Sequence, residues 1–253
     1  MMNGGHPDNP VTREKYDAVL FDLDGVITNT AKMHATCWKK MFDAYLKKRS
    51  AKTGELFRPF DLVADYTVYV DGKPRFDGVR DFLLSRGIRL AEGLPDDPPR
   101  KETVCGLGNH KNQLIEAFLE TDGVEAYEGT VAFLRHVRAE GIKTAVVTSS
   151  QNGKAVLNAA GIGDLFDVEV DGNTLVHQHL AGKPAPDSFL KAAEMLGVRP
   201  ARAVVVEDAI SGVQAGATGG FGLVIGVARK GNAEELKQHG AHLVVTDLGE
   251  FVR

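Results

Sequence analysis

Short apolar runs that stop abruptly at polar residues constrain the fold of this chain more than any other feature. Residues 18–21 read Ala-Val-Leu-Phe and lead directly into Asp22 and Asp24. Residues 144–147 and 203–206 are similar runs, again followed by polar side chains. Unbroken apolar runs of this length are typical of parallel strands that are buried on both faces. The sequence therefore predicts strands of a parallel sheet, rather than helices, at these places.

Helical patterns alternate with the apolar runs near the start of the chain and in its second half. Strands are expected at 18–21, 144–147, 203–206, 223–227 and 242–245, and helices near 130–139, 153–160, 187–196 and 210–217. Such alternation predicts an α/β fold with a Rossmann-like parallel sheet. We assign this core to residues 15–30 and 122–253.

A helix-rich segment, residues 31–121, interrupts the predicted core. Apolar residues recur at helical spacing over 33–46, and a second helix is expected around 111–120. We predict an inserted α-helical cap with hinges near 29–30 and 122–123. Two loops are expected, at 94–99 and at 172–181. Residues 1–14 are rich in Gly, Asn and Pro and predict a mobile N-terminal arm.

The ends of the predicted strands place chemistry-bearing side chains together. In open parallel sheets the ligand crevice lies outside the carboxyl ends of the strands, so Asp22, Thr148 and the pair Glu207-Asp208 should converge. Side chains alternate along a strand, so Asp22 and Asp24 leave the sheet on the same side. Two carboxylates aimed at one point repel each other unless a cation or a shared proton lies between them. The pair therefore predicts a nucleophile and an acid/base assisted by a metal ion.

Lys183 adds an ammonium group ahead of the helix expected at 187–196. Each of these residues also has a plainer interpretation, because strand-end Asp, Thr and Ser side chains commonly cap the following helix. Thr148-Ser149-Ser150 could cap the helix that starts near Asn152, although a helix N-terminus also favours bound anions.

Composition excludes several classes of function. A net charge of −4 over 253 residues gives no basic footprint for a nucleic acid. No apolar run approaches the roughly 18 residues of a membrane span, and the N-terminus lacks the apolar region of a signal peptide. We therefore expect a cytoplasmic enzyme without nucleic-acid or membrane partners. Cys37 and Cys105 show no metal-binding spacing and are expected to be reduced and packed inside.

The set Asp22-x-Asp24-Gly25, Thr148, Lys183 and Glu207-Asp208, in this order, resembles the four motifs of the haloacid dehalogenase superfamily. The resemblance implies that Asp22 forms an aspartyl phosphate and that Asp24 protonates the leaving oxygen. Thr148 and Lys183 would hold the transferring phosphoryl group. Mg2+ would lie between Asp22, the backbone carbonyl of Asp24, Asp208 and Glu207.

The cap segment resembles the β-phosphoglucomutase-like subfamily. The spacing of Thr30, His34 and Trp38 is similar to the segment that leads from core to cap in that subfamily. Arg75 and Lys111 match its cap anchors, which implies that they hold the phosphate that is not reacting. The resemblance also implies substrate contacts for Ser149 and Asn152. In plainer terms, Trp38 could be cap core, His34 a packed histidine, and the two cations ordinary surface charges.

The resemblance implies a Mg2+-dependent phosphomutase that acts on a small-molecule sugar phosphate, with glucose 1,6-bisphosphate as activator. The alternative is a phosphatase that hydrolyses a small sugar phosphate on the same scaffold. Gln151 and Ala209 stand where the subfamily often has Lys and Ser. These departures leave the balance between the two activities open. A catalytically silent binding protein is a third interpretation. A monomer or weak homodimer is expected.

Overall fold

The computed structural model describes residues 9–252, which form two compact units. Unit 1 is Met1–Asn29 with Val124–Arg253, of which residues 9–29 and 124–252 are described, and unit 2 is Thr30–Gly123. The chain thus leaves unit 1 and returns to it next to the predicted hinges. That unit 2 covers the substrate as a cap remains a prediction.

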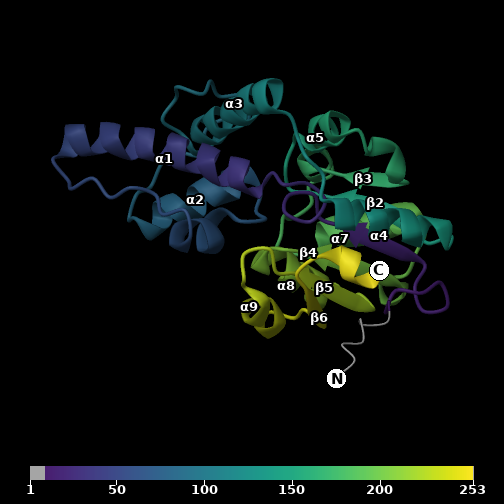
Figure 1. Cartoon of the computed structure of the whole chain (residues 1–253). Coiled ribbons are helices and arrows are strands. Elements are labelled where there is room, and N and C mark those ends of the chain that lie inside the picture. Colours follow the sequence, from purple (N-terminus) through teal and green to yellow (C-terminus); the bar gives the residue numbers. More distant parts are fainter. Residues whose placement is uncertain (1–8, 253) are drawn as a thin grey trace. The chain divides into compact units, whose positions relative to one another are not determined.

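Unit 1 is built on a six-stranded sheet with the strand order β3-β2-β1-β4-β5-β6 (Figure 1). All neighbouring strands in it are parallel, which confirms the predicted fold class. The strands are β1 Ala18–Phe21, β2 Lys143–Val147, β3 Val168–Val170, β4 Ala203–Glu207, β5 Leu223–Val227 and β6 Leu243–Val245.

Helices alternate with the strands of unit 1. They are α4 Glu128–Ala139, α5 Gly153–Ala160, α6 Gly172–His177, α7 Asp187–Leu196, α8 Ile210–Thr218 and α9 Ala233–Gln238. Helix α7 packs on β1, β2 and β3, and α8 packs on β4 and β5.

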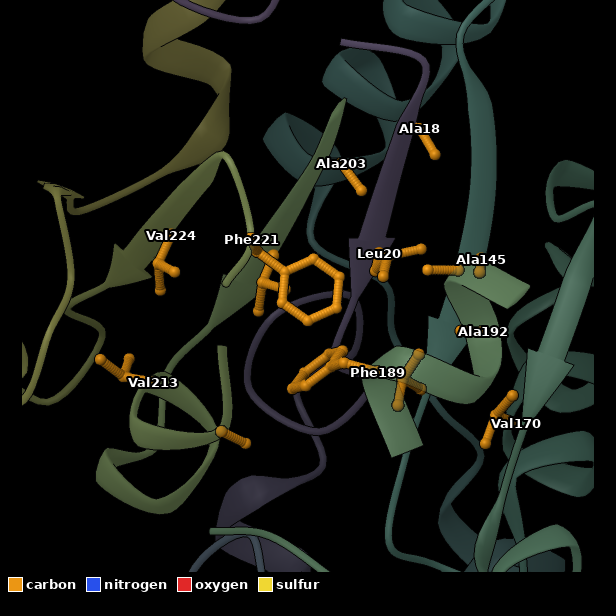
Figure 2. Packing of buried hydrophobic residues seen from close by; sticks show 14 of the residues in the cluster. Ala18, Leu20, Ala145, Val170, Phe189, Ala192, Ala203, Val213, Phe221 and Val224 are labelled. Carbon is orange, nitrogen blue, oxygen red and sulfur yellow. The ribbon is translucent and has the colours of Figure 1, made fainter. Parts of the chain in front are cut away.

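Successive side chains of β1 are buried against different helices. Leu20 belongs to an apolar cluster with Phe189 of α7 and with Phe221 (Figure 2). The next residue, Phe21, meets Phe133 of α4 edge to face, with 6.1 Å between the ring centroids. Helices on both faces explain why this strand is apolar without alternation.

Unit 2 consists mainly of helices with a core of their own. They are α1 Ala31–Thr53, a short π-helix at Tyr66–Val70, α2 Arg75–Ser85 and α3 Val104–Asp122. Phe42 stacks on Trp38 and on Phe60, with centroid distances of 5.3 and 5.2 Å. Phe82 of α2 closes the aromatic cluster against Phe42 at 4.2 Å.

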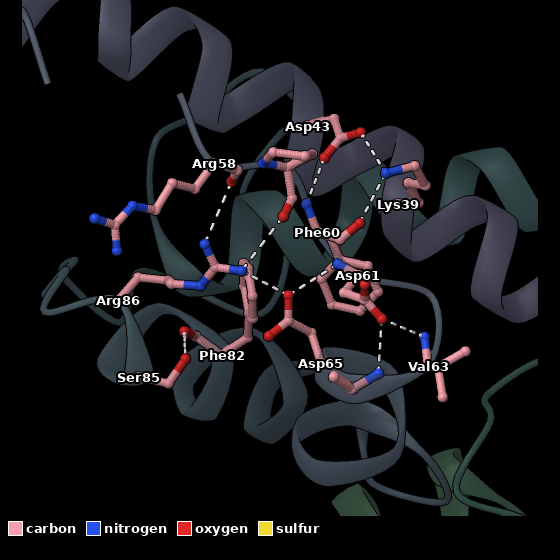
Figure 3. A network of polar contacts seen from close by, with 12 residues as sticks. Lys39, Asp43, Arg58, Phe60, Asp61, Val63, Asp65, Phe82, Ser85 and Arg86 are labelled. Carbon is pink, nitrogen blue, oxygen red and sulfur yellow. Dashed lines mark hydrogen bonds and ion pairs between the residues drawn. The ribbon is translucent and has the colours of Figure 1, made fainter. Parts of the chain in front are cut away.

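A polar network secures the segment between α1 and the π-helix (Figure 3). Arg86 donates to the backbone carbonyl oxygens of Arg58 and Pro59 and pairs with Asp65 at 2.6 Å. Its guanidinium also lies over the Phe82 ring. One arginine at the end of α2 therefore holds residues 58–65 in place.

The sequence analysis missed several short elements. Strand β3 has three residues, one of them Glu169, and this is too short to show a pattern. The predicted loop 172–181 begins as helix α6, because Asp171 forms a capping box with Thr174. Helices α2 and α9 were not predicted. Helix α1 extends beyond the predicted range of 33–46, to Thr53.

The predicted N-terminal arm lies only partly within the described residues, since residues 1–8 are outside them. Within the described part, Val11 is buried and Arg202 donates to the backbone carbonyl oxygens of Arg13 and Glu14. Residues 11–14 are therefore attached to unit 1, which shortens the predicted arm. Over residues 9–252, no helix has the length and apolarity needed to cross a membrane.

Candidate active site

A buried lysine bridges two carboxylates at the carboxyl edge of the sheet. Asp22 follows β1, and its backbone N–H donates to the carbonyl oxygen of Val206 in β4. Lys183 Nζ lies 2.5 Å from Asp22 Oδ1 and 2.6 Å from Glu207 Oε1, and it also donates to the backbone carbonyl of Val147 at 3.2 Å. Residues from three different strand ends thus meet at one ammonium group, as the parallel sheet predicts.

The Glu207-Asp208 pair is fixed by backbone contacts. Glu207 Oε2 accepts hydrogen bonds from the backbone N–H groups of Asp208 and Ala209, each at 3.1 Å. A Cβ added at Gly212 would lie 1.8 Å from Glu207 Oε1, so α8 approaches this carboxylate closely because it carries glycine there. The ligand oxygens of Asp22, Glu207 and Asp208 lie within 4.8 Å of one another.

Charge and burial shift the proton affinities in this cluster. Burial and the Glu207 carboxylate raise the pKa of Asp22 well above its ordinary value, while Lys183 opposes the shift. Burial lowers the pKa of Lys183, but the charges of Asp22 and Glu207 outweigh it and hold the pKa above the usual value. Lys183 therefore remains protonated. The carboxylates around it outnumber this one positive charge, so the cluster attracts a second cation.

The remaining core residues of the predicted site include Asp24 and the residues that follow β2. Thr148 Oγ1 is 3.5 Å from Asp24 Oδ2, at the long limit of a hydrogen bond. Thr148 Oγ1 also accepts from the backbone N–H of Ser150 at 3.1 Å. Ser149 follows Thr148 in the loop after β2, and Asn152 is the N-cap residue of α5 without a side-chain capping bond. The structure thus brings together six of the core residues that the sequence predicted, whereas their roles remain predictions; these are Asp22, Asp24, Thr148, Lys183, Glu207 and Asp208.

The predicted cap residues lie in unit 2. Lys111 Nζ is 2.9 Å from His34 Nδ1 and 5.1 Å from the centroid of the Trp38 ring, and all three side chains are buried. Thr30 is buried at the N-terminus of α1, where its carbonyl oxygen accepts from the His34 N–H. The stacking of Trp38 in the aromatic cluster agrees with the plainer interpretation of this residue as cap core.

Arg75 is a half-buried cation at the start of α2. Its Nε and Nη1 atoms are buried and have no hydrogen-bond partner among residues 9–252. Burial lowers its pKa, and the charge of Glu116 acts in the opposite direction. A Cβ at Gly108 of α3 would lie 2.6 Å from the Phe76 ring and 3.5 Å from Arg75 Cγ. The Arg75 stem therefore packs on α3 one turn before Lys111.

Sequence reasoning missed the loop after β5. Lys230 Nζ lies 3.1 Å from Asp208 Oδ2, and Asn232 donates to the backbone carbonyl of Asp208 at 3.4 Å. The neighbouring Arg229 donates to the Gly25 carbonyl at 3.4 Å. The available signal was the same as at the other strands, since polar residues follow an apolar run at its carboxyl end.

The fold and the site together define an α/β protein with a buried cluster of ionisable side chains at the carboxyl edge of a parallel sheet. The family model of haloacid dehalogenase-like hydrolases matches residues 16–220. The chain belongs to this family, and it is an enzyme of the phosphomutase and phosphohydrolase kind.

Curated relatives match most or all of the chain. The chain is 51% identical over 262 residues to a protein of Mycobacterium bovis named "Beta-phosphoglucomutase", covering 100% of both. It is 32% identical over 198 residues to a Bacillus subtilis protein of the same name, covering 78% of this chain and 77% of the relative. A solved β-phosphoglucomutase from Clostridium difficile superposes with a TM-score of 0.72 at 27% identity, covering 93% of this chain and 92% of that one.

Proposed function

We propose that this enzyme is a Mg2+-dependent phosphomutase that converts β-glucose 1-phosphate to glucose 6-phosphate through an aspartyl phosphate on Asp22. The observation that carries the chemistry is the buried set of Asp22, Lys183, Glu207 and Asp208 at the carboxyl edge of the sheet. The full-length similarity to a relative named as a β-phosphoglucomutase supports the choice of sugar.

The donor set fits Mg2+. The acidic cluster offers hard oxygen ligands, which this ion prefers. Both oxygens of Glu207 already have partners, Lys183 and two backbone N–H groups. Asp22, Asp208 and the backbone carbonyl of Asp24 would therefore hold the ion, with Glu207 supporting them. When bound, Mg2+ neutralises charge on the phosphoryl oxygens and on the acids around it.

In the first half-reaction, an Asp22 carboxylate oxygen attacks phosphorus and the bond from phosphorus to the sugar oxygen breaks. Asp24 gives its proton to that oxygen, so the sugar leaves as an alcohol. In the second half-reaction, Asp24 takes the proton from the incoming sugar hydroxyl, whose oxygen attacks phosphorus and breaks the bond to Asp22. A carboxylate nucleophile thus divides one difficult transfer into two easier ones.

Lys183 and Thr148 stabilise the phosphoryl group during both steps. The Lys183 ammonium is held by two carboxylates and by the Val147 carbonyl, so it does not have to reorganise when charge develops on phosphoryl oxygens. Ser149 and Asn152, in the loop after β2 and at the start of α5, would bind the remaining oxygens.

Arg75 and Lys111 would hold the phosphate that is not reacting, with Thr30, His34 and Trp38 forming the adjacent sugar site. Support comes from the buried Nε and Nη1 atoms of Arg75, because buried N–H groups without a hydrogen-bond acceptor in the described chain are suited to an incoming anion. A mutase needs such a second anchor, since its bisphosphate intermediate must reorient in the site without dissociating from the enzyme. Glucose 1,6-bisphosphate would accordingly activate the enzyme by phosphorylating Asp22.

The test is to incubate the protein with β-glucose 1-phosphate, Mg2+ and a trace of glucose 1,6-bisphosphate, and to measure glucose 6-phosphate and free phosphate in the same tube. The proposal expects fast formation of glucose 6-phosphate with little phosphate. Phosphate release without isomerisation would establish the phosphatase alternative, for which Gln151 in place of a cation is the motivating residue.

The Asp22→Asn variant is the matched control for the chemistry. It retains the shape and hydrogen-bonding capacity of the side chain but lacks the nucleophilic carboxylate, so both products should disappear. An unchanged thermal unfolding midpoint, within a few degrees, would show that the fold is intact. Retained turnover in this variant would overturn the aspartyl-phosphate mechanism.

A further inference from the structure

The loop after β5, residues 228–232, brings a second lysine to the acidic cluster. Lys230 Nζ lies 3.1 Å from Asp208 Oδ2, a carboxylate whose side chain is 3% exposed. Asn232 of the same loop donates to the backbone carbonyl of Asp208. Lys183, the lysine assigned to the phosphoryl group, is engaged by Asp22 and Glu207 instead. Each lysine therefore neutralises a different part of the cluster.

We propose that Lys230 is a built-in counter-ion that competes with Mg2+ for Asp208 and thereby weakens the affinity of the site for the metal. The inference rests on the metal site of the proposed function. It assigns to Lys230 a role outside the reaction itself, because this residue sets how much free Mg2+ the enzyme requires.

An ammonium group beside a metal-binding carboxylate can act in two opposite ways. It can orient the carboxylate, in which case its removal weakens metal binding, or it can compete by charge, in which case its removal strengthens binding. The packing of Gly25 decides between these effects. A Cβ added at Gly25 would lie 2.3 Å from Asp208 Oδ2 and 2.6 Å from its Cγ, so the backbone of the loop after β1 already confines this carboxylate.

The backbone of Asp208 is also fixed without Lys230. Its N–H donates to Glu207 Oε2, and its carbonyl oxygen accepts from Asn232. Orientation is thus supplied several times over, and the contribution that remains to Lys230 is its charge.

Exposure distinguishes the two lysines further. The Lys183 side chain is 1% exposed and cannot leave the site, whereas the Lys230 side chain is 32% exposed on a surface loop. When a divalent cation binds Asp208, repulsion displaces the Lys230 ammonium into water at little cost. In the absence of the cation, the same ammonium offsets the repulsion among the carboxylates. The negative charge of Asp208 is therefore offset both with the metal ion bound and without it.

The experiment is a calorimetric titration of the full-length protein with MgCl2, comparing the wild type with Lys230→Met, Lys230→Arg and Lys191→Met. We expect Lys230→Met to lower the dissociation constant for Mg2+ by roughly fivefold, the scale of a partly exposed ion pair acting on a divalent ion. Lys230→Arg keeps the charge and should bind as the wild type does. Lys191→Met removes an ion pair of the same 3.1 Å distance on α7 and should also bind as the wild type does.

Thermal unfolding in EDTA supplies a readout that is independent of activity. Lys230→Met should unfold at a lower temperature than the wild type in EDTA and gain more from saturating Mg2+. Unchanged or weaker Mg2+ binding in Lys230→Met would overturn the role of Lys230 while leaving the metal site intact. Absence of Mg2+ binding by the wild-type protein would instead overturn the metal site of the proposed function, and the inference with it.

Discussion

Two sets of charged residues, one buried and one half-buried, differ in their hydrogen-bond partners. Asp22, Lys183 and Glu207 are buried together and satisfy one another within hydrogen-bonding distance. Arg75 differs, because its buried Nε and Nη1 atoms have no partner among the residues that the structure describes. Buried N–H groups without an acceptor cost stability, so we expect an anion to bind to Arg75.

Replacement of Arg75 with Ala should lower kcat/KM for β-glucose 1-phosphate by on the order of 100-fold, since a buried charge pair with the substrate is lost. Hydrolysis of acetyl phosphate, which has no second anchor, should be unchanged. Steady-state kinetics with both substrates checks this. Arg80→Ala is the control, because Arg80 lies on the same helix but is engaged by Asp77 and Glu92. Equal losses with both substrates would contradict a role in holding the distal phosphate.

Replacement of Gly25 tests the close packing of the loop after β1 against Asp208. Its φ of +91° disfavours any side chain, and an added Cβ would lie 2.3 Å from Asp208 Oδ2. Gly25→Ala should therefore abolish measurable Mg2+ binding and activity. Gly141→Ala shares the positive φ, at +75°, but has nothing within 4 Å of the added atom, and it should cost only about 1 kcal/mol of stability. Similar Mg2+ binding by both variants would show that Asp208 can move aside.

At the scale of elements, the two ends of the parallel strands carry different features. The carboxyl ends carry the candidate site, whereas the amino ends of β1 and β4 are joined by an ion pair. Arg202 Nε and Nη2 donate to the two carboxylate oxygens of Asp17, each at 2.8 Å. Hydrogen bonding to Arg202 holds the pKa of Asp17 well below its usual range, with a further contribution from Arg13.

This ion pair gives a pH-dependent stability that is separable from activity. A depressed folded-state pKa contributes stability above the unfolded-state value, about 3.9 for Asp, and the contribution is lost as pH falls through the folded-state pKa. Asp17→Asn should therefore unfold at a lower temperature than the wild type at pH 7, and the difference should shrink below about pH 4. Turnover at pH 7 should not change. The exposed Asp164→Asn is the control, and a difference independent of pH would argue against the ion pair as the cause.

At the scale of the whole molecule, the largest hydrophobic clusters given for the two units share no residue. Phe189 belongs to the core beneath the sheet of unit 1, and Phe82 belongs to the aromatic core of unit 2. Both side chains are fully buried. A cavity in either core should therefore lower the stability mainly of its own unit.

Hydrogen exchange followed by mass spectrometry tests this separation. Phe82→Ala should cost about 3–5 kcal/mol and increase exchange over residues 30–123, while strands β1, β2 and β4 keep their protection. Phe189→Ala should give the reverse pattern. Loss of protection throughout the chain in both variants would mean that the units unfold as one.

How much the sequence could predict depends on how local each signal is. Asp22, Thr148 and Glu207 were predictable as a cluster because each directly follows an apolar run, and parallel strands bring their carboxyl ends together. Strand β3 and helix α6 were missed because three and six residues are too few to show a period. Helix α2 was missed as well, although Arg75 at its start was singled out by resemblance.

Apolar periodicity and strand-end polar residues are properties of neighbouring positions, so they sufficed to predict the α/β class, the insertion and a cluster of polar side chains at the sheet edge. Which charges neutralise one another emerged from the folded structure alone. Lys183 contacts Asp22 across 161 positions of sequence, and Lys230 contacts Asp208 from a loop that follows a different strand. These pairings arise from strand order and side-chain packing, which no local pattern encodes.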